Sequence, residues 1–270
     1  MHSTLVNGRR SHVVSALDRG LAYGDGVFRT LKIHQNKPVW WADHYAKLAH
    51  DCRALELACP DPNLLRFEVE AVTRELAEGA VKIIVTRGEG ARGYALSNPV
   101  SPTRIVMAST LPAHPQQATG GVNVRWCNLR LARQPQLAGI KHLNRLENVL
   151  ARNEWRDPDI AEGLLCDDTG AVIGGTMSNL FIIREGRLHT PDLTQTGVDG
   201  VARLRILRAA ALYGIDVRIR RLESEEILAA DEVFLSNSII GVWRVARLDD
   251  RQWKPAGWTE QFKHWIDETD

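Results

Sequence analysis

The alternation of apolar and polar residues along the chain predicts short strands interleaved with amphipathic helices. In the first hundred residues, β-rich runs over Gly26–Ile33 and Lys37–Trp41 flank a turn at His34–Asn36. The other elements predicted in this part are helices over Ala42–Leu57 and Pro62–Glu78 and strands over Val81–Thr86 and Thr103–Ser109. Helices and strands alternate, so the pattern indicates an α/β fold.

The mixed pattern continues beyond residue 120. The predicted strands are Val122–Leu131, Glu162–Cys166, Ala171–Ile173, Leu180–His189, Val217–Arg221 and Glu232–Leu235. The predicted helices are Arg145–Arg156, Gly200–Tyr213, Glu223–Ala230 and Thr259–Asp267. Between the two halves, residues 111–121 collect Pro, Gly and Gln without an apolar period. We therefore predict an N-terminal domain of residues 1–112, a linker of residues 113–120 and a C-terminal domain of residues 121–270.

Charge and cysteine content exclude several classes of partner. The 34 basic and 33 acidic residues leave a formal net charge of +1, which provides no broad field for nucleic acid or an anionic membrane. The four cysteines have no CxxC spacing, which argues against a zinc site or a disulfide scaffold. The N-terminus lacks an apolar signal core, and no apolar stretch is long enough to span a membrane. We expect a reduced, cytoplasmic protein without a bound metal.

Lys141 is a candidate for covalent chemistry because of where it lies. The segment Gly139–Arg152 has leucines at helical spacing, and Asn144 with Glu147 has the spacing of a capping box. Lys141 is therefore expected just before a helix. An isolated lysine is normally a solvated surface charge. A catalytic lysine needs a site that lowers its pKa and a cofactor whose ring makes the adduct useful.

A glycine-rich turn at Thr196–Leu207 opens directly onto a predicted helix. Free backbone N–H groups at such a helix start, near Val201 and Ala202, form a natural phosphate cradle. The alternative is an ordinary Asp-Gly turn that precedes a helix.

The segment Asp18–Thr30 predicts a turn followed by a strand. Phe28 and Thr30 share one face of that strand, while Val27 and Arg29 share the other. The alternative here is a hairpin entry in which Thr30 serves strand propensity alone.

The motifs taken together resemble a known family. They are DRGLAYGDGVFRT (18–30), HYAKL (44–48), GIKHLNRLENVLAR (139–152), GGTMSNLFI (174–182), GVDGVAR (197–203) and FLSNS (234–238). In this order they resemble the fold-type IV pyridoxal-phosphate proteins, which include branched-chain aminotransferases, D-amino acid aminotransferases and aminodeoxychorismate lyases. The resemblance extends from about residue 5 to about residue 245. It implies two domains, a small N-terminal α/β domain and a larger C-terminal domain with a barrel-like sheet, and a homodimer.

The resemblance also implies a cofactor site. It makes Lys141 the Schiff-base lysine for pyridoxal 5'-phosphate and places the phosphate at Val201 and Ala202. Asn237 and Ser238 are expected to complete the phosphate site. Lys47 stands where the family normally has a phosphate-binding arginine, so the charge is kept and the bidentate fork is lost.

Two positions bear on the expected reaction. Thr30 lies where the lyases of this family have a threonine proposed to transfer a proton, and the stretch around Lys141 is most similar to the lyases. Gly174 replaces the glutamate that usually pairs with the pyridine nitrogen, which argues against demanding carbanion chemistry. The expected reaction is therefore conversion of 4-amino-4-deoxychorismate to 4-aminobenzoate and pyruvate, a step of folate biosynthesis. The alternatives are a branched-chain or D-amino acid aminotransferase and a cofactor-binding protein that has lost catalysis.

Such a substrate carries two carboxylates and calls for fixed cations. The predicted substrate-binding residues are Arg29, Arg92 and Tyr94. Arg92 and Tyr94 lie in the glycine-rich loop Arg87–Tyr94. The alternative for each arginine is a solvated surface position.

Overall fold

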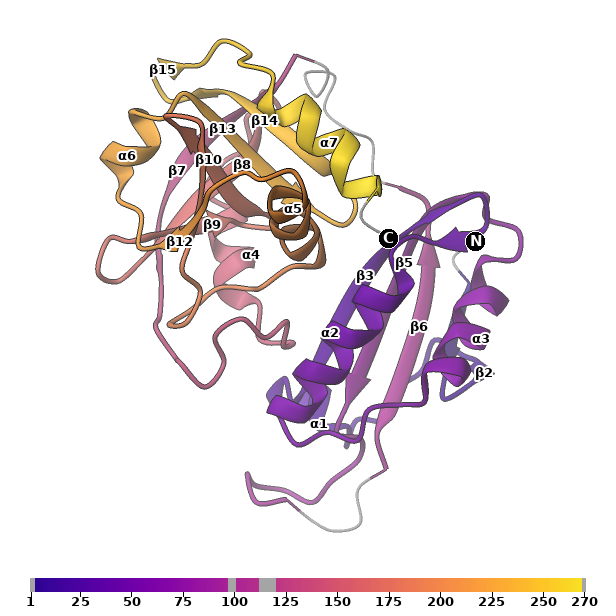
Figure 1. The fold of residues 1–270 in the computed structure, drawn as a ribbon. Coiled ribbons are helices and arrows are strands. Elements are labelled where there is room, and N and C mark those ends of the chain that lie inside the picture. The colour runs from indigo at the N-terminus through magenta and orange to yellow at the C-terminus, as the bar shows by residue number, and fades with distance from the viewer. Residues whose placement is uncertain (1–2, 97–100, 112–119, 269–270) are drawn as a thin grey trace. The chain divides into compact units, whose positions relative to one another are not determined.

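The structure is a computed structural model that describes residues 3–96, 101–111 and 120–268 (Figure 1). The chain forms two units: the first comprises Met1–Pro112 and Ile140–Asn144, and the second comprises Ala113–Gly139 and Arg145–Asp270. Lys141 therefore belongs to the first unit, whereas the sequence analysis placed it in the C-terminal domain. The predicted linker lies outside the described residues except for Gly120.

The first unit contains a six-stranded sheet in the order β2-β1-β6-β5-β3-β4. Its strands are β1 (Thr4–Val6), β2 (Arg9–Arg10), β3 (Gly26–His34), β4 (Lys37–Pro38), β5 (Glu78–Thr86) and β6 (Thr103–Ser109). Its helices are α1 (Arg19–Tyr23), α2 (Trp41–Ala54) and α3 (Pro62–Thr73). In Figure 1, α2 and α3 pack on the sheet, α2 against β3 and α3 against β6.

The strand β3 shows the alternation that the sequence predicts. Val27, Arg29 and Leu31 are buried, while Phe28 and Thr30 on the other face are half-buried. The buried apolar residues of β3 share one core with Leu48 of α2. This packing fixes which side chains of β3 stay available for a site.

Two boundaries in the first unit differ from the prediction. The predicted strand Lys37–Trp41 is only two residues long, because Trp40 has a left-handed backbone with φ 54° and α2 begins directly after it. The predicted helix Pro62–Glu78 ends at Thr73, because Glu78 already pairs with His34 at the start of β5. Pairing with β3 thus takes precedence over helical periodicity.

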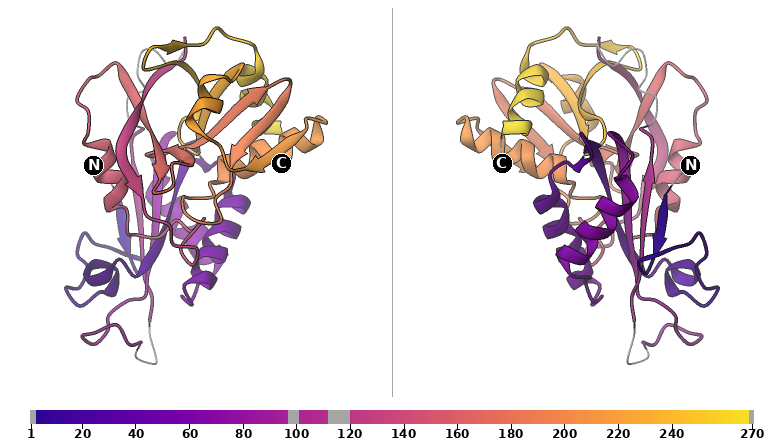
Figure 2. Two further views of the ribbon diagram at one scale, coloured as in Figure 1. Left: turned by 90° about the vertical axis from the view of Figure 1, so that its left-hand side faces the viewer. Right: turned by 90° about the vertical axis from the view of Figure 1, so that its right-hand side faces the viewer.

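The second unit contains a nine-stranded sheet that curls into a half-barrel (Figure 2). The path is β12-β11-β10-β13-β14-β7-β8-β9, and β15 pairs with β14. The strands are β7 (Val122–Leu131), β8 (Ile160–Asp167), β9 (Val172–Gly175), β10 (Asn179–Arg184), β11 (Arg187–Pro191), β12 (Val217–Arg220), β13 (Glu232–Asn237), β14 (Gly241–Leu248) and β15 (Arg251–Gln252). The helices are α4 (Leu146–Arg152), α5 (Val201–Leu212), α6 (Ser224–Leu228) and α7 (Trp258–Glu268).

The predicted strand Leu180–His189 is in fact the hairpin of β10 and β11. Glu185 and Gly186 turn with φ values of 51° and 73°, the positive values that a tight hairpin needs. Aromatic rings then join the sheet to α7, since Phe234 stacks on Phe181 at 5.0 Å and on Phe262 at 5.3 Å between ring centroids. Over the described ranges, no helix is long and apolar enough to cross a bilayer.

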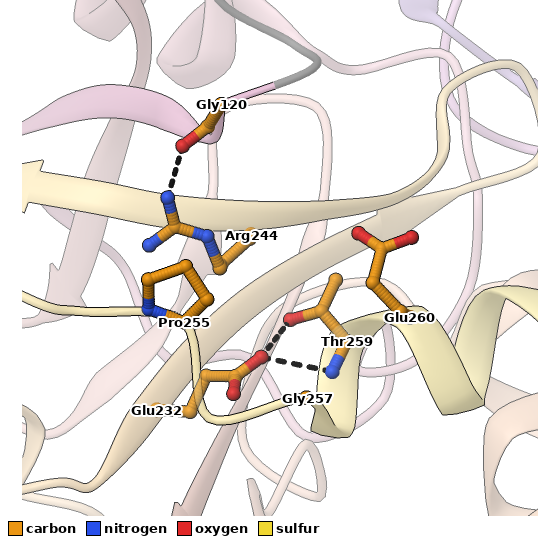
Figure 3. A pocket seen from close by; sticks show the side chains of 7 residues that line it. All are labelled: Gly120, Glu232, Arg244, Pro255, Gly257, Thr259 and Glu260. Carbon is orange, nitrogen blue, oxygen red and sulfur yellow. Dashed lines mark hydrogen bonds between the residues drawn. The ribbon is translucent and has the colours of Figure 1, made fainter.

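A buried carboxylate fixes the start of α7 (Figure 3). Glu232 accepts hydrogen bonds from the N–H groups of Ala256 and Thr259, at 2.9 and 2.8 Å, and from the Thr259 hydroxyl. The cavity beside it has a volume of about 280 Å³ and is lined by Gly120, Glu232, Arg244, Pro255, Gly257, Thr259 and Glu260. None of the predicted site residues lines this cavity, so we assign Glu232 to the stability of the second unit.

Candidate cofactor site

Lys141 is held beside β3 by backbone hydrogen bonds. The N–H of Phe28 donates to the Lys141 carbonyl at 2.9 Å, and the N–H of Leu143 donates to the Gly26 carbonyl at 2.9 Å. Val27 and His142 form an isolated antiparallel bridge. The segment around Lys141 therefore continues the sheet of the first unit.

The Lys141 side chain lies on the half-buried face of β3. Its Nζ is 4.7 Å from the centroid of the Phe28 ring. Nζ of Lys82 lies 4.7 Å from the same centroid, and burial lowers the pKa of Lys82. Lys82 pairs with Thr30 across β3 and β5. Lys141, Phe28, Thr30 and Lys82 thus form a group of side chains in the first unit, and sequence reasoning missed Lys82.

The structure gives Arg29 contacts that differ from its predicted use. Arg29 is 2% exposed, and its Nη2 donates to Asp51 Oδ2 and, at 3.1 Å, to the Lys47 carbonyl. These contacts are structural and do not support a role in binding a substrate carboxylate. Lys47 itself is half-buried on α2, and its phosphate-binding role stays a prediction.

The glycine-rich loop of the first unit is anchored by an arginine that the sequence analysis did not single out. Nη1 of Arg19 donates to the Gly93 carbonyl at 2.8 Å, and its Nε donates to Asp25 at 3.0 Å. Asp25 also accepts from Arg87, and both guanidiniums lower its pKa against the opposing effect of burial. The side chains of Arg92 and Tyr94 are exposed. Both are therefore accessible, as a substrate contact requires.

In the second unit, α5 begins as a phosphate-binding helix would. The N-cap is Gly200, which has no side chain to cap the helix, and the first turn closes with Leu204 N–H donating to the Gly200 carbonyl at 3.1 Å. The N–H groups of Val201 and Ala202 lie in the first turn of α5, where backbone donors have no acceptor within the helix and can bind an anion.

At Gly200, directly before α5, the Asn179 side chain leaves no room for a Cβ atom. Asn179 Oδ1 accepts from the Gly200 N–H at 3.2 Å, and Asn179 Nδ2 donates to the Val198 carbonyl at 2.8 Å. A Cβ at Gly200 would lie 2.5 Å from Asn179 Oδ1. The helix start therefore presents a cradle of bare backbone whose N–H donors fit a phosphate group. Asn179 lies in the GGTMSNLFI motif, but no local pattern singles it out from its neighbours in that motif.

Asn237 has contacts of its own at the turn after β13. Its Oδ1 accepts from the N–H groups of Ile239 and Ile240, at 2.8 and 2.9 Å, and its Nδ2 donates to the Met177 carbonyl at 3.1 Å. Ser238 is half-buried in the same turn. Asn237 thus holds the turn, and participation of both residues in the phosphate site stays a prediction.

Glu162 is a buried carboxylate close to the segment that contains Gly174. It does not replace the glutamate that the family normally has at the position of Gly174. It accepts from the N–H groups of Gly163, Thr176 and Met177 and from the hydroxyls of Thr176 and Ser178. Burial raises the pKa of Glu162, and these hydrogen bonds oppose the rise. Five donors use the lone-pair sites of both oxygens, which leaves none for a pyridinium N–H.

The capping box predicted before α4 is not formed. The N-cap is Arg145, Glu147 Oε1 accepts from the Ala132 N–H at 2.9 Å, and Asn144 Nδ2 donates to the Gly24 carbonyl at 3.3 Å. Each side chain serves a long-range contact in its own unit, and these contacts replace the local pairing.

The folds of the two units agree with one class of protein. The model of the amino-transferase class IV family matches residues 26–248, and the chain belongs to this family. Among curated relatives, an aminodeoxychorismate lyase from Vibrio harveyi is 34% identical over 88% of this chain and 88% of its own. Among solved structures, the 4-amino-4-deoxychorismate lyase from Pseudomonas aeruginosa is 44% identical, with a TM-score of 0.93 and 98% of both chains covered. The branched-chain aminotransferase from Escherichia coli, at 23% identity and a TM-score of 0.85, shares the fold over 97% of this chain and 92% of its own.

Proposed function

We propose that the protein is a pyridoxal-phosphate-dependent lyase that converts 4-amino-4-deoxychorismate to 4-aminobenzoate and pyruvate. The observation that carries the proposal is the full-length likeness to lyases at 34% and 44% identity. The residues that the resemblance selects fit the cofactor: Lys141 supplies an amine beside β3, and α5 supplies a bare helix start.

The cofactor, when bound, supplies an electron-withdrawing ring that stabilises negative charge on the substrate. Nζ of Lys141 holds the cofactor, and the N–H groups of Val201 and Ala202 bind its phosphate, with charge from Lys47 and further contacts from Asn237 and Ser238.

Protons move through two side chains in this proposal. Nζ of Lys141, free once the substrate amine has taken its place, removes the proton from C4 of the substrate, since a lysine amine close to the reacting carbon needs no additional base. Thr30, on the same half-buried face of β3 as Phe28, delivers a proton to the departing pyruvyl carbon. Arg92 and Tyr94 are the proposed ligands of the substrate carboxylates, because both are exposed in a loop that Arg19 anchors.

The absence of a carboxylate at Gly174 is compatible with this reaction. Loss of the C4 proton and of the enolpyruvyl group turns a cyclohexadiene into an aromatic ring, so the product supplies driving force that amino transfer lacks. A weaker electron sink is then sufficient, and Glu162 is not required to substitute for the missing carboxylate.

We also propose a cytoplasmic homodimer. The exposed face of α4 carries Leu146, Val149 and Leu150, with 68%, 52% and 52% of their surfaces exposed. Apolar residues at this helical spacing are typical of a surface that another protein covers. The four cysteines are free thiols, as in a reducing compartment. A monomer in light scattering at micromolar concentration would contradict the dimer.

The test of the function is a product assay. The protein is incubated with chorismate, glutamine and a synthase that forms the aminated intermediate, and 4-aminobenzoate and pyruvate are quantified. We expect both products in equal amounts, and we expect no amino transfer to keto acids. Amino transfer from branched-chain or D-amino acids without 4-aminobenzoate would replace the lyase assignment by that of an aminotransferase.

A further inference from the structure

Asp51 is a buried acid on α2 that contacts the backbone of Lys141. It is 1% exposed, and its Oδ2 accepts from the Lys141 N–H at 3.0 Å. The same oxygen accepts from Nη2 of Arg29. One carboxylate oxygen therefore joins the interior of the first unit to the peptide of the proposed cofactor lysine.

A carboxylate at this depth needs a compensating charge, because burial of an unpaired charge is strongly unfavourable. Arg29 supplies that charge from the buried face of β3. The Arg29 guanidinium also donates to the Lys47 carbonyl at 3.1 Å, which ties the pair to α2. The ion pair thus fixes the Asp51 side chain under the Lys141 peptide.

The other side of the Lys141 residue is fixed as well. Its carbonyl accepts from the Phe28 N–H at 2.9 Å. With both backbone groups held, the Lys141 side chain leaves from a Cα whose position and direction are set by β3 and α2. A reactive amine that starts from a fixed Cα samples fewer unproductive orientations.

We propose that Asp51 is a positioning residue for Lys141 and that Arg29 supports Asp51. The inference rests on the proposed function in one respect, namely that Nζ of Lys141 holds the cofactor. It gives Arg29 a role that its burial allows, in place of the substrate contact predicted from the sequence.

The experiment measures how fast Lys141 reacts with added pyridoxal phosphate. The aldehyde condenses with the Nζ amine and releases water, and the visible absorbance of the product reports the rate. Two double variants of the apo-protein are compared: Arg29→Met/Asp51→Ala and Arg29→Met/Asp51→Asn. Both remove the ion pair, but only the second keeps an oxygen that accepts from the Lys141 N–H.

We expect the alanine variant to react about fivefold more slowly than the asparagine variant, the effect of one hydrogen bond. Equal rates in the two variants would overturn the inference. The matched control is Glu68→Gln, which disrupts another buried carboxylate pair of the first unit, since Glu68 is 2% exposed and accepts from Arg104 at 2.8 and 3.0 Å. It should lower the thermal midpoint and leave the reaction rate unchanged.

Hydrogen exchange in the wild-type protein provides a second test that needs no variant. The Lys141 N–H should exchange slowly because it is bonded to a buried oxygen, and exchange at the rate of an unprotected amide would also overturn the inference. Failure of this inference can be distinguished from failure of the proposed function. If the wild-type protein does not react with pyridoxal phosphate at Lys141, the proposed function fails, and the exchange rate still tests the contact with Asp51.

Discussion

Nζ of Lys141 lies 4.7 Å from the centroid of the Phe28 ring. The ring also contacts the ammonium of Lys82 at 4.7 Å, so one aromatic side chain lies within cation–π range of two lysines. Phe28 alternates along β3 with the buried Val27 and Arg29, which fixes its ring on the half-buried face. The strand pattern therefore sets the face of β3 on which Phe28 contacts Lys141 and Lys82.

Lys82 makes stability depend on pH. Burial lowers its pKa from the usual 10.5, so the unfolded chain binds this proton more tightly than the folded chain does. The protonated side chain therefore opposes folding, and stability should rise with pH between the lowered folded pKa and 10.5. Lys82→Met should remove this rise, measured by urea unfolding at several alkaline pH values. The exposed Lys37 supplies the control, since Lys37→Met should leave the pH dependence as in the wild type.

Gly200→Ala should weaken cofactor binding. The new Cβ would lie 2.5 Å from Asn179 Oδ1, so Asn179 must move and its bonds to the Gly200 N–H and the Val198 carbonyl are disturbed. We expect the Kd for pyridoxal phosphate, measured by fluorescence titration, to rise roughly tenfold, as for loss of one to two hydrogen bonds. Ala211→Gly destabilises the exposed end of α5 by about 1 kcal/mol and should leave the Kd unchanged. An unchanged Kd in Gly200→Ala would contradict the assignment of the start of α5 as the phosphate-binding site.

Gly174→Glu should not improve the lyase greatly. A Cβ at this position lies 2.8 Å from the Ser178 carbonyl, so the backbone must shift, at a loss of about 1 to 3 kcal/mol of stability. Gly174→Ala introduces the same Cβ without a carboxylate, so it measures the steric effect alone. We expect kcat to change by less than tenfold relative to Gly174→Ala. A rise of about a hundredfold, equivalent to about 2.7 kcal/mol, would show that the reaction needs the ring carboxylate.

Glu162→Gln should destabilise the second unit. The NH2 group of glutamine would replace one of the two oxygens. It would place its own donors either against the N–H groups of Gly163 and Thr176 or against the Met177 N–H and the Ser178 hydroxyl. We expect a loss of about 1 to 3 kcal/mol in urea unfolding, the range for buried donors left without acceptors. Glu75→Gln, at an exposed site of the first unit, should change the free energy of unfolding by less than about 0.5 kcal/mol. A variant at position 162 as stable as the control would contradict the buried network.

Local patterns were sufficient to predict part of this structure. The period-two alternation of β3 predicted which face carries Thr30, and the glycine-rich turn predicted a helix from Gly200, one residue before the observed start of α5 at Val201. Both features depend on residues that are neighbours in the chain. The family resemblance extended them to a fold, which the whole-length structural similarity confirms.

Long-range contacts could not be predicted in the same way. The role of Asp51 depends on Lys141, 90 positions further along the chain. One signal was present, because Asp51 shares a helical stripe of α2 with His44 and Leu48, and a charge on such a stripe suggests a buried partner. The capping box predicted for Asn144 and Glu147 failed for the same reason, since contacts with distant residues outweighed a local motif.

The central claim is that one amine, Nζ of Lys141, holds pyridoxal phosphate, and a mass measurement tests it most directly. The protein is incubated with pyridoxal phosphate, reduced with borohydride and digested, and the modified lysine is located by mass spectrometry. We expect the reduced cofactor on Lys141 and loss of the visible absorbance in Lys141→Ala. Modification of Lys47 or Lys82 instead, with the absorbance retained in Lys141→Ala, would contradict the account.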